Sequence, residues 1–81
     1  MNHEEKYVKI ISVLRGVPGV TDAKDLAHKL ADQPDWSERR ENIITWYIAL
    51  SFAKDGLNYG TVGAKEMEQI ALEKIKKAIT I

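Results

Sequence analysis

The most apolar stretch of the chain reads Ile43-Ile44-Thr45-Trp46-Tyr47-Ile48-Ala49-Leu50-Ser51-Phe52-Ala53. Its plainly polar members are Thr45 and Ser51, and three of the chain's aromatic residues lie within it. A helix at the surface of a globular protein needs one apolar stripe, whereas this stretch is apolar almost all round. We therefore expect it to form the central helix of a small helical domain, with the other helices covering most of its sides.

The sequence before this stretch extends the same helix back to Asp35. Asp35 is followed three residues later by Glu38, the spacing of a capping box, and Ser37 is a competing cap. Gly56 can terminate the helix after Lys54-Asp55, which gives a helix over residues 35–55. Because its first turns are charged, we expect that end to protrude and the later turns to be enclosed.

Two shorter helices are predicted ahead of it. Residues 4–15 carry apolar side chains at the i, i+3, i+4, i+7 spacing of one helical face, and Gly16 with Pro18 stops that helix. Thr21 is a suitable cap for a second helix over residues 21–32, whose apolar face is built largely of alanine. Pro34 prevents the second helix from continuing.

A fourth helix is predicted over residues 64–79, with acidic residues early and lysines late, as the helix dipole favours. No stretch alternates with the period of a strand. The sequence therefore predicts one all-α, compact four-helix domain over residues 1–81, with the third helix central. The connection over residues 56–63 is its longest loop and carries three of the five glycines.

Composition narrows the class of function. The 12 basic and 12 acidic residues give zero net charge, so the basic excess typical of nucleic-acid-binding proteins is missing. The chain has no cysteine, which excludes disulfides, thiolate metal sites and a cysteine nucleophile. The eleven-residue apolar stretch is shorter than the roughly 20 residues that a membrane span needs. We expect a small soluble cytoplasmic protein that does not bind membranes.

No pattern of reactive side chains points to catalysis. His3 and His28 are too few for a transition-metal site, and His28 is expected on the solvent side of its helix. Gly60 and Gly63 precede a helix, but the full phosphate-loop pattern and its preceding strand are missing. We therefore predict no catalytic residue, no metal and no cofactor.

The candidate partner surface consists of Trp36, Arg39, Arg40 and Tyr59. Trp and Arg are enriched at interface hot spots, although Trp36 can also close the core and the arginines can simply be solvated. Two hypotheses follow. The favoured one is a non-enzymatic protein–protein interaction or regulatory module that binds another protein or a second copy of itself. The alternative is a helix-turn-helix-like nucleic-acid-binding regulator that uses Arg39 and Arg40.

A second basic set, Lys74, Lys76 and Lys77, lies near the end of the chain. Its simplest explanation is a solvated helix face that also compensates the helix dipole. The apolar stretch itself favours association, because three short helices have much apolar surface to cover.

Overall fold

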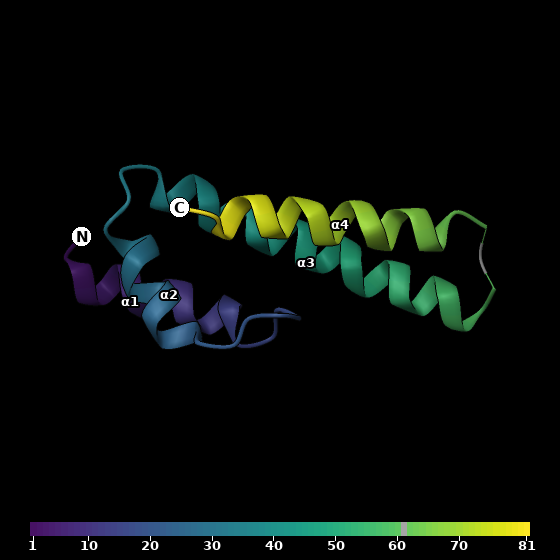
Figure 1. The fold of residues 1–81 in the computed structure, drawn as a ribbon, viewed down its shortest axis with the longest axis horizontal. Coiled ribbons are helices and arrows are strands. Elements are labelled where there is room, and N and C mark those ends of the chain that lie inside the picture. Colours follow the sequence, from purple (N-terminus) through teal and green to yellow (C-terminus); the bar gives the residue numbers. More distant parts are fainter. Residues whose placement is uncertain (61) are drawn as a thin grey trace.

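A computed structural model describes residues 1–60 and 62–81 of the chain. Those residues form four α-helices and no β-strand, which confirms the predicted all-α class (Figure 1). The helices are α1 (His3–Leu14), α2 (Ala23–Ala31), α3 (Trp36–Asn58) and α4 (Ala64–Ile79). As predicted, α3 is the longest helix and contacts the other three.

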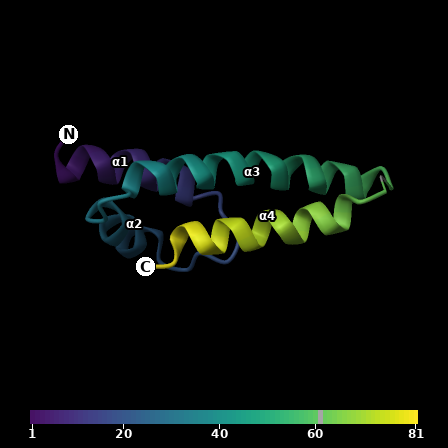
Figure 2. The ribbon, with the colours of Figure 1, turned by 90° about the horizontal axis from the view of Figure 1, so that it is seen from above.

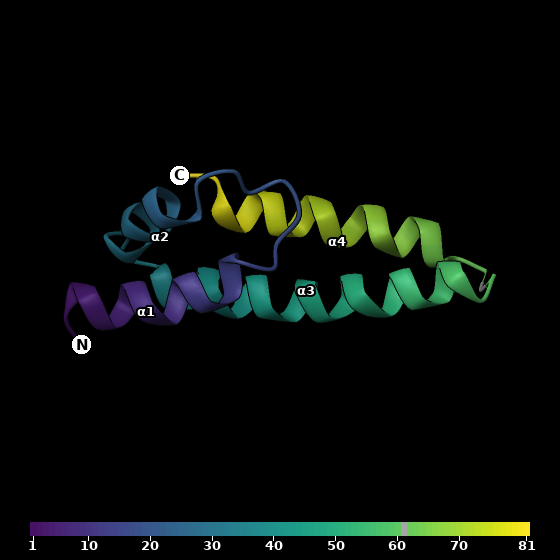
Figure 3. The ribbon, with the colours of Figure 1, turned by 90° about the horizontal axis from the view of Figure 1, so that it is seen from below.

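The helices are arranged as a long hairpin with a small helical pair at one end. α3 and α4 run antiparallel, and α1 and α2 pack beside the end of the hairpin where α3 begins (Figures 1 and 2). Neither α1 nor α2 reaches the opposite end of the hairpin, as a third view also shows (Figure 3). The resulting shape is elongated, with extents of 44 × 18 × 18 Å.

The core lies where all four helices meet. Its largest fully buried side chains are Ile10, Leu14, Leu30, Ile43 and Leu50. Burying a side chain of this size contributes roughly 1.5–3 kcal/mol. Farther along the hairpin the buried residues are alanines, contributed by both α3 and α4, so the two helices need only small side chains between them there.

The helix starts depart from the predictions in detail. α2 is capped by Asp22 rather than by Thr21, because the Asp25 amide donates to the Asp22 carboxylate at 3.1 Å. Asp35 is the N-cap residue of α3, as predicted, but its carboxylate accepts from Arg39 Nε at 2.7 Å and makes no side-chain capping bond. The predicted capping box therefore does not form.

The end of α3 was also placed too early. The helix passes through Gly56 and ends at Asn58, and the Gly60 amide donates to the Leu57 carbonyl at 3.2 Å. Gly60 has φ +70°, so it supplies the left-handed residue that the sequence analysis assigned to Gly56. Gly16 likewise has no positive φ, whereas Gly19 in the same turn has φ +83°. Thr61, in the predicted 56–63 loop, lies outside the described residues.

The structure reverses the prediction of which end of α3 is covered. Its charged first turns lie between α1 and the end of α4, where Arg40 Nε donates to the Lys9 carbonyl at 3.4 Å. Its apolar later turns protrude, and Phe52 is 72% exposed. The reason is that α1 and α2 are short helices and that the chain enters α3 from α2 at the first residue of α3. Neither helix therefore reaches the far half of α3.

Candidate interaction surface

The exposed side of α3 carries large apolar side chains where a helix normally carries charges. Ile48 is 51% exposed and Phe52 is 72% exposed. They are four residues apart, so they lie on the same side of the helix. No charged residue occurs between Glu41 and Lys54, which leaves about 12 residues, or roughly 18 Å of helix, without a charge. Water therefore meets an uncharged, largely apolar helix surface here.

α4 adds two more apolar side chains on a neighbouring side of the hairpin. Lys74 Nζ lies 5.9 Å from the centre of the Trp46 ring, and this contact marks one side of the α3–α4 pair. Four and seven residues back from Lys74 are Ile70 and Met67, which are 43% and 42% exposed. Both therefore lie along the side that the Trp46–Lys74 contact marks.

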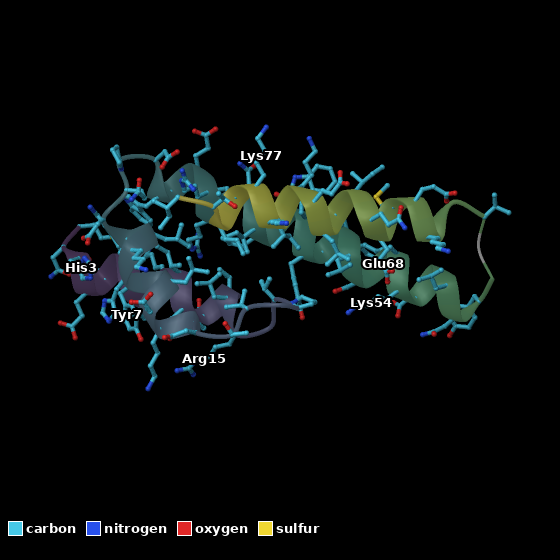
Figure 4. All side chains as sticks on the ribbon, viewed as in Figure 1. His3, Tyr7, Arg15, Lys54, Glu68 and Lys77 are labelled. Carbon is cyan, nitrogen blue, oxygen red and sulfur yellow. The ribbon has the colours of Figure 1, made fainter. Side chains whose placement is uncertain are left out.

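Phe52 and Ile48 lie on a different side of α3 from Trp46, because six and two residues of helix turn them about 120° and 160° away from it. Ile48 lies near the end of α1, where it borders a groove together with Ser12 and Val13. We call the α3 surface formed by Ile48 and Phe52 the distal apolar face. Glu68 lies off this face, since it shares a helical stripe with the buried Ala64 and Ala71. Figure 4 shows Glu68 and Lys54 on the two helices of this part of the hairpin.

The distal apolar face exposes two large apolar side chains. A fully exposed large side chain presents about 200 Å². At the fractions observed, Ile48 and Phe52 together expose roughly 250 Å². Scattered single apolar residues need no explanation, whereas two such side chains one turn apart on a charge-free helix surface are a candidate interaction site.

Tyr59 lies far from the other three residues of the predicted partner surface. Trp36 is half-buried against the core, and Lys6 Nζ lies 5.7 Å from its ring centre. Arg39 and Tyr59 are 20 residues apart on α3, which corresponds to about 30 Å of helix. Tyr59 is 87% exposed at the tip of the hairpin, beyond the distal apolar face.

The two arginines are engaged within the chain. Arg39 Nη1 donates to the carbonyl oxygens of Ala78 at 3.2 Å and Thr80 at 2.5 Å, and its Nε binds Asp35. Arg40 donates to the Lys9 carbonyl and to the Glu41 carboxylate. Arg39 thus caps the end of α4 with a cation, where the helix dipole favours positive charge. Arg39 therefore has a role in the fold, in addition to the role in partner binding that the sequence analysis proposed for it.

A polar cluster that the sequence analysis missed joins α1 to α2. His3 Nδ1 lies 2.8 Å from Asp32 Oδ1, and His3 Nε2 lies 3.0 Å from His28 Nδ1. The Tyr7 ring stacks on His28 with a centroid separation of 4.0 Å. His28 is exposed, as predicted, but it also has these partners. The cluster joins residues more than 20 positions apart in the sequence, so no local sequence pattern predicts it.

The pKa of Lys29 is shifted by a neighbouring carboxylate on α2. The Asp25 carboxylate accepts a hydrogen bond from Lys29 Nζ at 2.9 Å. That bond, together with the negative charge of Asp25, raises the pKa of the Lys29 ammonium group, and Asp22 adds to the effect. The pair is exposed at one turn's spacing on α2, so it is a surface contact of that helix.

Comparison with known proteins adds no relative. No protein-family model, curated protein or solved structure matches the chain. Among residues 1–60 and 62–81, no helix has the length and apolar character to cross a membrane. Within the same residues no group of three or more histidine, cysteine or acidic side chains is arranged to hold a metal ion.

The sequence did contain a signal for the distal apolar face. Within residues 43–53, Ile43 and Leu50 form one apolar stripe, and Ile48 and Phe52 form another on a different side. Met67 and Ile70 lie at the edge of the apolar stripe of residues 64–79. The pattern did not show that the second stripe of α3 and the edge of the α4 stripe are both exposed to solvent.

Proposed function

We propose that this chain is a non-enzymatic protein–protein interaction module that binds through the distal apolar face. The observation that carries the proposal is the exposure of Phe52, at 72%, one turn from the exposed Ile48 on a surface of α3 that is free of charge. Aromatic side chains bury large areas and dominate interface energetics. A partner that covers Phe52 removes a large apolar side chain from water.

The distal apolar face is a better candidate than the predicted arginine surface. Arg39 and Arg40 already donate hydrogen bonds to carbonyl oxygens of the chain, and a partner would have to replace those bonds. Phe52 and Ile48 have no polar group to satisfy, so covering them costs no hydrogen bond. Nucleic-acid binding through Arg39 and Arg40 would also have to replace these hydrogen bonds, so we rank it below protein binding through the distal apolar face.

Photo-crosslinking in cells that express the chain tests this proposal. The full chain carries the photoreactive amino acid benzoylphenylalanine at position 52, and a control chain carries it at Glu4, an exposed position near the N-terminus at the opposite end of the molecule (Figure 1). We expect irradiation to yield a discrete adduct with a polypeptide from position 52 and none from position 4. Equal, diffuse adducts from both positions, or none from position 52, would overturn the proposal.

A further inference from the structure

We propose that His3 and His28 bind one divalent transition-metal ion between them, and that Asp32 orients His3 for this role. The site joins the first turn of α1 to the last turns of α2. The sequence analysis set the two histidines aside because two ligands fall short of a closed metal site. The structure brings their ring nitrogens together across 25 residues of chain and so gives the pair a geometry that can be compared with that of a metal site.

The two facing nitrogens are as far apart as two ligands of one metal ion. His3 Nε2 lies 3.0 Å from His28 Nδ1. Zinc–nitrogen bonds are about 2.0–2.1 Å long, so two nitrogens on one ion lie about 2.9 Å apart at a right angle and about 3.3 Å apart at the tetrahedral angle. The observed separation falls between these two values. An ion can therefore replace the proton between the nitrogens while their separation changes by about 0.3 Å or less.

The two rings also need little reorientation. They meet edge to edge, because the nitrogens are 3.0 Å apart whereas the ring centroids are 5.3 Å apart. Two imidazoles on one tetrahedral ion have centroids about 5 Å apart, so the rings already stand at the required separation. Their planes differ by 4°, so a tilt of each ring within its own plane turns both lone pairs toward one point. The His3 side chain is 44% exposed and has room for this tilt.

Asp32 determines which nitrogen of His3 faces the ion. Its Oδ1 lies 2.8 Å from His3 Nδ1. An ionised carboxylate only accepts hydrogen bonds, so Nδ1 carries the proton and Nε2 keeps a free lone pair. Metal-binding histidines commonly donate their other ring N–H to a carboxylate, which fixes the ring and raises the basicity of the ligating nitrogen. Asp32 is therefore a positioning residue and not a ligand.

His28 is held in place by Tyr7, whose ring stacks on it with a centroid separation of 4.0 Å and an interplanar angle of 11°. In the metal-free chain His28 Nδ1 donates to His3 Nε2, because that nitrogen of His3 is the acceptor. When an ion binds, the proton leaves His28 Nδ1 and another is taken up from water at His28 Nε2. Both rings stay neutral, and the pair neither releases nor consumes a proton overall.

The ligands select the class of ion. Imidazole suits Zn²⁺, Ni²⁺ and Cu²⁺, whereas Mg²⁺ and Ca²⁺ are held by oxygen ligands. The Asp32 side chain is 72% exposed, so water reaches the site and can fill the remaining coordination positions. With two protein ligands in place of the four of a structural zinc site, we expect a dissociation constant for Zn²⁺ on the order of 1–100 µM.

Calorimetric titration of the full, chelator-treated chain with zinc chloride provides the first test. One Zn²⁺ should bind per chain, and magnesium chloride should give no binding heat. His3→Gln and His28→Gln should each show no binding up to about 1 mM Zn²⁺, because a single imidazole remains. Circular dichroism of each variant checks that its helix content is unchanged. Equal Zn²⁺ binding by wild type and His28→Gln, or none by the wild type below about 1 mM, would refute the site.

A pair of carboxylate variants tests the positioning role. Asp32→Asn should weaken Zn²⁺ binding by about tenfold, since it removes the partner that orients His3. Asp55→Asn is the matched control, because Asp55 is an exposed carboxylate at the far end of α3, and its affinity should equal that of the wild type. Equal losses in the two variants would mean that general negative charge, and not the orientation of His3, supports binding.

Nitrogen NMR of the imidazole rings identifies the ligating atoms. Zn²⁺ should shift the resonances of His3 Nε2 and His28 Nδ1 and leave protons on His3 Nδ1 and His28 Nε2. Coordination through the other two nitrogens, or through one histidine alone, would contradict the arrangement. Amide exchange in the first turns of α1 should slow when Zn²⁺ is bound, because the ion ties α1 to α2.

The metal site is independent of the proposed function. Figure 4 shows His3 and Tyr7 at the N-terminal end of the molecule and Lys54, two residues beyond Phe52, toward the tip of the hairpin. Loss of Zn²⁺ binding in His28→Gln should therefore leave crosslinking from position 52 unchanged. A chain that binds no Zn²⁺ but still crosslinks from position 52 would disprove the metal site and keep the binding face.

Discussion

The hydroxyl group of Tyr47 lies against the backbone of Gly16, so that a Cβ atom at position 16 would approach its oxygen to 2.9 Å. Real Cβ atoms essentially never come this close to another heavy atom, so one of the two groups has to move. Through this contact α3 fixes where α1 ends and where the turn to α2 begins. Gly16 is therefore required for space, although its backbone needs no positive φ.

We predict that Gly16→Ala destabilises the chain by about 1 kcal/mol, at the low end of the cost of overpacking. Tyr47→Phe removes the oxygen that would collide, and the next nearest ring atom is 3.3 Å away. The alanine should therefore be close to neutral in the Tyr47→Phe background. Urea unfolding of the four chains gives the coupling between the two positions. Equal costs of Gly16→Ala in both backgrounds would show that the contact is unimportant.

Two neighbouring positions on α3 should respond in opposite ways to truncation. Leu50 is 1% exposed, and Leu50→Ala should cost about 2–5 kcal/mol, which can unfold a domain of this size. Phe52 is 72% exposed, and Phe52→Ala should change the stability of the monomer by less than about 0.5 kcal/mol. Thermal unfolding at low micromolar concentration measures both.

The same measurement can contradict this contrast. A large loss of stability from Phe52→Ala would place Phe52 within the core of the chain, and a small loss from Leu50→Ala would show that Leu50 contributes little to it.

The His3–His28 hydrogen bond should help to hold the first turns of α1 against α2. His3 Nδ1 lies 2.8 Å from Asp32 Oδ1, and His3 Nε2 lies 3.0 Å from His28 Nδ1. One of the two facing nitrogens donates and the other accepts. His28→Gln replaces the ring that also stacks on Tyr7, so both contacts between the helices should weaken.

The measurement is the amide hydrogen exchange of the first turns of α1, together with the NMR shifts of the Tyr7 ring. Both should change in His28→Gln, with an effect below about 1 kcal/mol because the groups are exposed. If the variant and the wild type exchange at the same rate, the histidine pair does not hold this end of the chain.

The sequence predicted the helices well and the exposed surface poorly. The bounds of α4 were predicted as observed, because the glycine before the helix and the periodic apolar residues within it are local features of the sequence. Gly60 and Gly56 are both plausible terminators of α3, and the choice between them depends on how far α3 packs against α4. The side of α3 that stays open depends on where α1 and α2 dock, which is a tertiary property. The pattern of Ile48 and Phe52 alone does not contain it.

Arg39 offers a prediction that separates a structural role from recognition of a partner. It donates to the Ala78 and Thr80 carbonyl oxygens at the end of α4 and binds Asp35 at the start of α3. Hydrogen bonds from a charged donor are worth more than neutral ones, so Arg39→Ala should cost about 1–2 kcal/mol and speed amide exchange in the last turn of α4. Arg15→Ala, at an exposed position, is the control and should be nearly neutral.

The same pair of variants addresses nucleic-acid binding. If the arginines of α3 serve the fold, the wild-type chain should bind random duplex DNA no better than Arg39→Ala does at about 50 mM salt, where phosphate contacts are strong. Fluorescence anisotropy of a labelled duplex measures this. Wild-type binding that falls steeply with salt and disappears in Arg39→Ala, with no loss of thermal stability, would contradict the structural role and favour the nucleic-acid hypothesis.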